Sequence, residues 1–309
     1  MENDQFYWKF ALTFAFVIAT IFIAVHSGAV EALEETFNRI GWFELLVIFG
    51  LFGIMRMLQA LSLVRAIELV DGSLRFRESL DLAGLKGLYN LGLGGAGIVA
   101  QAVHARSRKL FSISTLAFAT ISQTMLLVSA LGTLLLLFST GLLRYPAVFW
   151  PLFAFGILAA VVPFLALHSQ RHARTLLSRV PRRLRFQFEN LGDSLPTPQF
   201  GQLFVLWLLQ TSLVVFRLSR ILAIALFLDP LTPLGHLAVV TLFADLVTVV
   251  PLTPGGIGMR EFFIGLGSSL GGQSELYITA AIIDRGITIV GNFIHGTAIL
   301  AKQPSHRST

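Results

Sequence analysis

The chain contains no cysteine, and only 13% of its 309 residues are charged. Without cysteine, disulfide bonds, cysteine nucleophiles and thiolate metal sites are excluded. The seven histidines are scattered and show no metal-ligand spacing, so no metal or other cofactor is expected. The His-Glu-x-x-His pair of metalloproteases is also absent. We therefore expect a protein that is not an enzyme.

Apolar residues dominate the composition. Hydrophobic residues make up 55% of the chain, and the mean hydropathy of +0.76 is far above that of soluble proteins. Apolar stretches of about 18 residues or more recur, and each can cross a bilayer core of ~30 Å. The sequence predicts an all-α, polytopic transmembrane helical bundle, organised as a single integral membrane domain over residues 1–309. About seven spans are expected, over Trp8–Val25, Trp42–Val64, Leu110–Leu143, Tyr145–Leu167, Phe200–Leu228, His236–Leu252 and Leu276–Ala301.

Positive charge is concentrated in two connectors. The formal net charge is +6, and residues 65–109 and 168–199 together hold thirteen Lys and Arg. The connectors 26–41, 140–146 and 229–235 hold only two. This asymmetry follows the positive-inside rule, so we predict that the charge-rich side and the N-terminus are cytoplasmic and expect no nucleic-acid partner. The first span is expected to be an uncleaved anchor, because Glu2 and Asp4 precede it.

The most informative segment is residues 251–261, where two prolines, three glycines and an Arg-Glu pair interrupt apolar sequence. Irregular backbone at membrane depth is tolerated only where it is buried in protein or lines a polar cavity. A threonine cap followed by proline predicts a re-entrant half-helix over 253–272, whose start would present N–H groups and positive dipole charge to an anion. The alternative is a helix-breaking turn whose glycines only allow close packing. The residues that would form the anion-facing start are Thr253, Pro254, Gly255, Gly256, Gly258 and Arg260.

Several ionisable residues lie inside apolar stretches, where insertion of each costs roughly 2.5–3.5 kcal/mol. Arg217 and Arg220 share one helix face and repel each other unless an anion or a carboxylate lies between them. Asp245 lies just before the half-helix. A polar stripe in the last span comprises Arg285, Thr288, Asn292 and His295, with Asp284 beside it. Either these groups line a pathway, or Asp245 and Asp284 pair with Arg217, Arg220 or Arg285 and simply lock helices together.

A second glycine patch, residues 89–98, makes 86–103 another re-entrant candidate, and Asn90 a candidate binding residue. The patch loosely resembles phosphate-binding glycine loops. No strand pattern precedes it, however, and the nucleotide-binding form needs a strand before the loop. Nucleotide binding is therefore not expected.

Residues 251–261, together with Ile282-Ile283-Asp284-Arg285-Gly286, resemble the membrane region of the lysylphosphatidylglycerol synthase/flippase family. The resemblance implies that the Pro-Gly segment and Glu261 shape a re-entrant element at a lipid head-group cavity, which Arg285 also lines. The other family motif is degenerate here: its asparagine and glycines remain, but its proline is missing. Uncharged residues stand near the positions of its charged ones, namely Ile98, Gln101, Ser122 and Gln123.

The resemblance and the charges at membrane depth predict a flippase-like protein of a prokaryotic plasma membrane. It would bind or move a phospholipid or lipid-linked head group, anionic or zwitterionic, for the cell envelope. The chain holds no counterpart of the family's synthase domain, so lipid aminoacylation is not expected. One alternative is an accessory membrane subunit that works with envelope-biosynthesis enzymes of a glycan pathway. Another is a small-solute secondary transporter, because a glycine-broken segment lies in each half of the chain.

Overall fold

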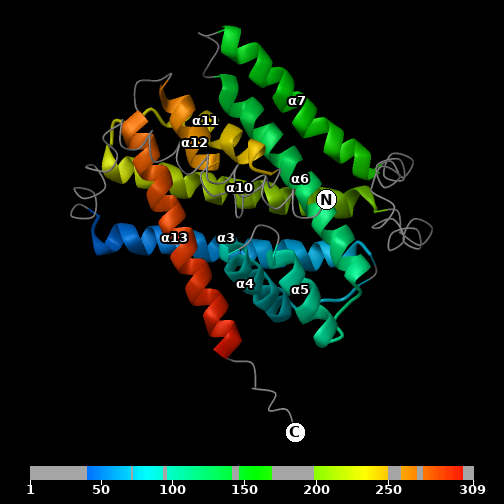
Figure 1. The fold of residues 1–309 in the computed structure, drawn as a ribbon. Coiled ribbons are helices and arrows are strands. Elements are labelled where there is room, and N and C mark those ends of the chain that lie inside the picture. Colours follow the sequence, from blue (N-terminus) through cyan, green and yellow to red (C-terminus); the bar gives the residue numbers. More distant parts are fainter. Residues whose placement is uncertain are drawn as a thin grey trace, which may run out of the picture. The chain divides into compact units, whose positions relative to one another are not determined.

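The computed structural model describes residues 40–70, 72–92, 96–140, 146–168, 198–249, 259–269 and 274–301. Within these ranges the regular secondary structure is helical and contains no strand, which confirms the all-α prediction (Figure 1). The helices are α3 (Trp42–Glu68), α4 (Phe76–Gly92), α5 (Ala96–Ser107), α6 (Ile113–Ser139), α7 (Pro146–His168), α10 (Phe200–Leu228), α11 (Leu234–Val247), α12 (Met259–Ser269) and α13 (Ser274–Ala301).

Five of these helices are long and apolar enough to cross a membrane, namely α3, α6, α7, α10 and α13. Each coincides with a span predicted from the sequence, and α10 has the predicted bounds at both ends. The predicted first span, Trp8–Val25, lies outside the described residues. Long apolar helices are the form in which a chain can satisfy its backbone N–H and C=O groups in lipid.

The prediction of a full-length span over His236–Leu252 was wrong. The helix there, α11, has 14 residues and is about 21 Å long, well short of the ~30 Å bilayer core. It ends at Thr248, whose hydroxyl donates to the carbonyl of Asp245 at 2.9 Å. The 11-residue α12 then occupies part of the predicted half-helix 253–272. The structure therefore has two short helices where we expected one span and a half-helix, and their re-entry into a bilayer stays a prediction.

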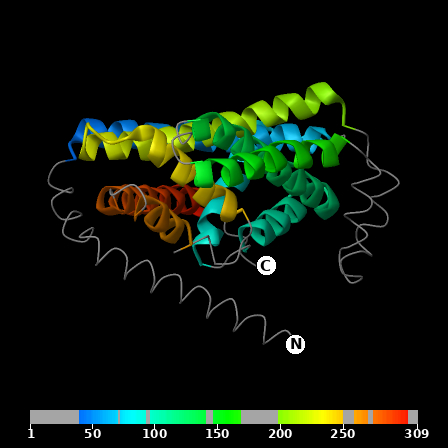
Figure 2. The same cartoon turned by 90° about the horizontal axis from the view of Figure 1, so that it is seen from above.

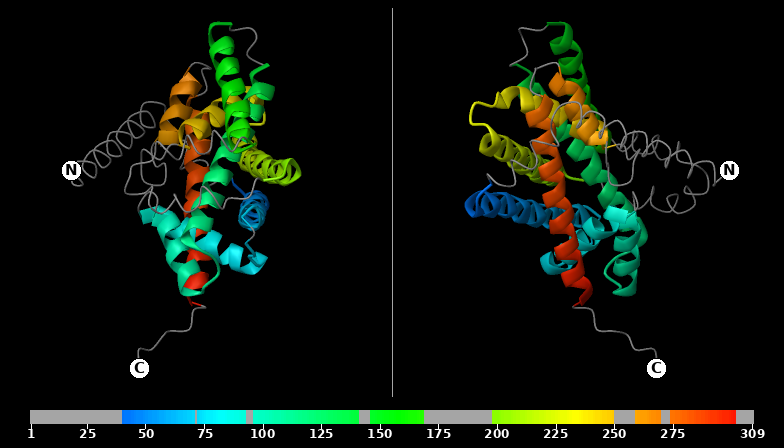
Figure 3. Two further views of the ribbon diagram at one scale, coloured as in Figure 1. Left: turned by 90° about the vertical axis from the view of Figure 1, so that its right-hand side faces the viewer. Right: turned by 60° about the vertical axis from the view of Figure 1, so that its left-hand side comes forward.

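The chain divides into two compact units whose segments alternate along the sequence. The first unit comprises residues 1–56, 81–101 and 216–309, and the second comprises 57–80 and 102–215. In the first unit, α12 packs against both α11 and α13 (Figure 3). This unit contains the candidate site. The single-domain organisation stays a prediction.

In the second unit, α6 packs closely against α7 (Figure 2). A Cβ atom at Gly132 would collide with the backbone of Ala159 and Ala160, so the glycine allows the two helices to approach. The Ser129 hydroxyl donates to the carbonyl of Ala160 at 2.5 Å. Pro163, one turn further along α7, lacks the N–H that would bond to the carbonyl of Ala159. The interhelical hydrogen bond therefore forms where the internal bonding of α7 is weakened.

Gly132→Ala is expected to destabilise the protein by about 1–3 kcal/mol, because the added methyl group meets rigid backbone. The measurement is the thermal unfolding temperature in detergent. The matched control is Gly50→Ala in α3, where a Cβ meets nothing within 4 Å. Equal unfolding temperatures for the two variants would contradict the close approach of α6 and α7.

Candidate functional site: a buried ion-pair network

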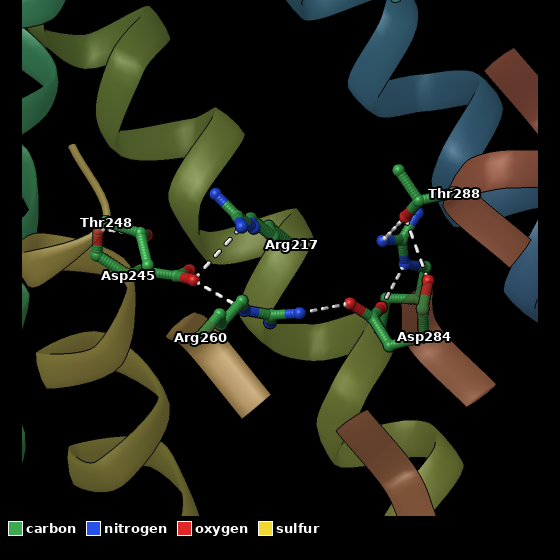
Figure 4. A network of polar contacts seen from close by, with 7 residues as sticks. Arg217, Asp245, Thr248, Arg260, Asp284 and Thr288 are labelled. Atoms are coloured by element: carbon green, nitrogen blue, oxygen red, sulfur yellow. Dashed lines mark hydrogen bonds and ion pairs between the residues drawn. The ribbon is translucent and has the colours of Figure 1, made fainter. Parts of the chain in front are cut away.

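Five charged side chains of the first unit form a continuous chain of ion pairs (Figure 4). Oδ1 of Asp245 binds Nη2 of Arg217 at 3.0 Å and Nε of Arg260 at 2.7 Å. Nη1 of Arg260 binds Oδ2 of Asp284 at 2.7 Å, and Oδ1 of Asp284 binds Nε of Arg220 at 2.6 Å. The chain thus links α10, α11, α12 and α13.

Arg260 lies at the centre of this network because it occupies the first turn of α12. The N-terminal end of a helix carries positive partial charge, so an arginine there is unfavourable unless carboxylates compensate it. Asp245 and Asp284 supply this compensation from the helices on either side of α12. The neighbouring Glu261 also suits the first turn, since a carboxylate interacts favourably with the dipole.

The members of the network differ in their exposure. Arg220, Arg260, Asp245 and Asp284 are buried, whereas the side chain of Arg217 is 30% exposed. Arg217 is therefore the paired arginine that a molecule from outside can contact without displacing the others.

The network carries more positive than negative charge, because three guanidiniums face two carboxylates. Arg285 interacts electrostatically with Glu261, so this second pair leaves the excess unchanged. Nη1 of Arg220 and Nη2 of Arg260 are buried and have no hydrogen-bond partner within the described chain. An excess of guanidinium donors is the complement of an anion, since arginine donates and never accepts hydrogen bonds.

The polar stripe predicted on α13 contributes directly to the network. The Thr288 hydroxyl accepts from Nη2 of Arg220 at 2.7 Å and donates to the carbonyl of Asp284 at 2.9 Å. Asn292 is buried one turn further along α13, and a Cβ atom at Gly84 of α4 would meet the ring of His295. Thr288, Asn292 and His295 thus extend the polar face of α13 from the ion pairs toward α4.

The structure brings together the predicted residues Arg217, Arg220, Asp245, Arg260 and Asp284. These contacts are aspartate–arginine ion pairs that join helices, as in the second of the two arrangements expected from the sequence, with one difference. We expected Arg260 to face an external anion, but its described partners are the two aspartates of the chain itself. The predicted half-helix start, with Thr253, Pro254, Gly255, Gly256 and Gly258, lies outside the described residues. Roles for these residues and for Glu261 and Arg285 in binding a ligand stay predictions.

Asn90 has a structural contact in the second predicted re-entrant segment. Its Oδ1 accepts a hydrogen bond at 2.9 Å from the N–H of Gly97, in the first turn of α5. Nε2 of Gln101 donates to the carbonyl of Leu82 at 3.1 Å. Each of these two hydrogen bonds joins α5 to α4. A role of Asn90 in ligand binding stays a prediction.

Gln123, at another position where the family motif is charged, takes part in a contact of the second unit. Nε2 of Gln123 and Nε2 of Gln210 both donate to the hydroxyl of Ser62, at 2.9 and 2.5 Å. These three residues tie together α3, α6 and α10. Two of the uncharged residues at motif positions, Gln101 and Gln123, therefore make helix-to-helix contacts in this chain.

The long apolar helices and the buried charges define a polytopic helical membrane protein with an ionic core. The family model "Lysylphosphatidylglycerol synthase TM region" matches residues 8–296, nearly the whole chain, so the protein belongs to this family. It is accordingly a multi-pass membrane protein associated with lipid or envelope biology. No curated protein and no solved structure matches the chain.

Arg260→Met is expected to destabilise the protein by about 3–5 kcal/mol, because it leaves two buried carboxylates without their shared cation. The measurement is equilibrium unfolding in mixed micelles. In the Arg260→Met background, Asp245→Asn should recover part of the loss. The control is Arg65→Met, which breaks an exposed ion pair with Glu68 and should have little effect. A loss at Arg260 no larger than at Arg65 would contradict the bridging role.

Asn90→Ala is expected to loosen the junction between α4 and α5, because it removes the acceptor for the Gly97 amide. Hydrogen exchange measured by mass spectrometry should become faster in peptides covering the start of α5. Exchange in α6 should stay unchanged and serves as the internal control. Unaltered exchange at the start of α5 would show that the hydrogen bond does not hold the junction.

Proposed function

We propose that this protein binds a phospholipid or lipid-linked head group and moves it across the membrane. The observation that supports the proposal is an ionic network with excess positive charge in a protein of apolar helices. Burial of charge at membrane depth is costly, and such charges mark pathways for polar solutes or ions. The family to which the chain belongs is itself named for a lipid synthase.

In this proposal the head group enters at Arg217. Its anionic group competes with Asp245 for the partly exposed guanidinium of Arg217, while Arg260 keeps Asp245 neutralised. Arg285, which interacts with Glu261, provides a second cation for the same head group. The acyl or prenyl tails stay in the lipid, so only the polar part of the molecule needs a path through the protein.

The proposed role is not enzymatic and places the protein in a prokaryotic plasma membrane with its N-terminus in the cytoplasm. Membrane lipids are its proposed partners, and envelope-biosynthesis enzymes would supply or use the lipid. The thirteen basic residues of connectors 65–109 and 168–199 support this orientation.

Liposomes that contain the purified protein are expected to move a labelled anionic phospholipid between leaflets faster than protein-free liposomes. Arg217→Gln and Arg285→Ala should each abolish the acceleration, whereas Arg217→Lys should keep part of it because the charge remains. The measurement is the loss of label fluorescence after an impermeant reductant is added. Arg65→Ala, at an exposed surface pair, is the matched control and should transport like the original protein.

Equal rates with and without the protein would remove the transport proposal. If the Arg217 and Arg285 variants were as active as the original protein, transport would not depend on the ionic network.

A second candidate is a small-solute secondary transporter. It is favoured by two pairs of consecutive short helices, α4–α5 and α11–α12, and the sequence between the members of each pair contains glycines. Broken helices in the two halves of a chain are typical of binding sites in such transporters. Solute uptake into vesicles without lipid movement would identify this function.

A further inference from the structure

Lys86 is a half-buried cation of α4 whose side chain forms no hydrogen bond or ion pair within the described part of the chain. Burial lowers the pKa of Lys86, and the nearby guanidinium of Arg56 lowers it further. A lysine beside another cation in a poorly solvated place is electrostatically unfavourable. A bound anion would remove this cost.

Arg56 and Arg220 bring two more cations to the same part of the first unit. Their guanidinium carbons lie over the ring of Phe52, at 5.1 and 5.7 Å from its centroid. A ring face stabilises a cation, yet two guanidiniums on one ring still repel each other. Arg220 is 2% exposed, and its Nη1 has no hydrogen-bond partner within the described chain. Nε and Nη2 of Arg220 bind Asp284 and Thr288, so Nη1 is the donor of this guanidinium that could bind a ligand.

Asn292 of α13 and Gly87 of α4 lie beside these cations. A Cβ atom at position 87 would collide with Nη2 of Arg56 and with Oδ1 of Asn292, so the glycine makes room for both side chains. Oδ1 of Asn292 is buried without a hydrogen-bond partner in the described chain. The oxygen and nitrogen of an asparagine amide can exchange places by a 180° rotation of the amide group. This rotation of Asn292 would present Nδ2 as a donor.

We propose that Arg56, Lys86, Arg220 and Asn292 form a phosphate-binding site that takes the head group of a phosphate monoester. Three cations supply donors from three helices, which suits a doubly charged group with three terminal oxygens. The site is distinct from the partly exposed position at Arg217, whose guanidinium is paired with Asp245. Binding here does not require transport, so the two proposals can fail separately.

The test is binding of phosphatidic acid, a lipid phosphate monoester, to the full chain in nanodiscs of phosphatidylcholine. Lys86→Gln and Arg56→Gln are expected to weaken binding about tenfold each, as loss of a charge-assisted hydrogen bond does. Lys86→Arg should retain binding, because it keeps the charge. Lys109→Gln is the matched control: it makes the same chemical change at an exposed position and should bind like the original protein.

A second arm measures the shift in thermal unfolding temperature that inorganic phosphate causes, with chloride at equal ionic strength as the reference. A shift that disappears in Lys86→Gln supports a site that recognises free phosphate as well. Binding of phosphatidic acid that depends on Lys86, without such a shift, supports a site that needs the lipid. Equal binding by Lys86→Gln and Lys109→Gln, or binding of phosphatidylcholine as tight as that of phosphatidic acid, would overturn the proposal.

Discussion

The bridge that Arg260 makes between Asp245 and Asp284 is the interaction on which the arrangement of the first unit depends. The helix that carries Arg260 has only 11 residues, so its own hydrogen bonds fix its position weakly. Two charge-assisted bonds of 2.7 Å to neighbouring helices define both its location and its rotation. The arginines of α10 and the polar face of α13 acquire their relative positions through the same two carboxylates.

Burying such a network costs desolvation free energy, which apolar contacts between helices do not. Replacing a buried ion pair with well-packed apolar residues is often neutral or stabilising, so the pairs are poor evidence for stability alone. They are better understood as a means of fixing one arrangement among several, because each carboxylate oxygen accepts from defined nitrogens. The partial exposure of Arg217 instead suits the proposed binding role, since fixing the helices does not require an accessible end.

The sequence predicted the long helices and the polar face of α13 well, because apolar run length and helical spacing are local properties. It did not predict the end of α11, since the apolar run continues past Thr248 and hydrophobicity alone does not mark where a helix stops. The partners of Arg260 were also missed. They depend on tertiary packing, which brings Arg260 into contact with residues 15 and 24 positions away. Asn90 drew attention as a motif residue, but its bond to Gly97 depends on the angle between two helices.

The imbalance of three arginines against two aspartates has a further consequence for energetics. If α10, α11, α12 and α13 shift together during the proposed transport cycle, the network moves as a body with about one net positive charge, whereas an isolated arginine pair would move two. A single charge crossing a membrane potential of 100 mV changes energy by about 2.3 kcal/mol. An incoming phosphate would cancel that charge. The electrical field would then act mainly on the empty carrier, so voltage would govern its return rather than the loaded step.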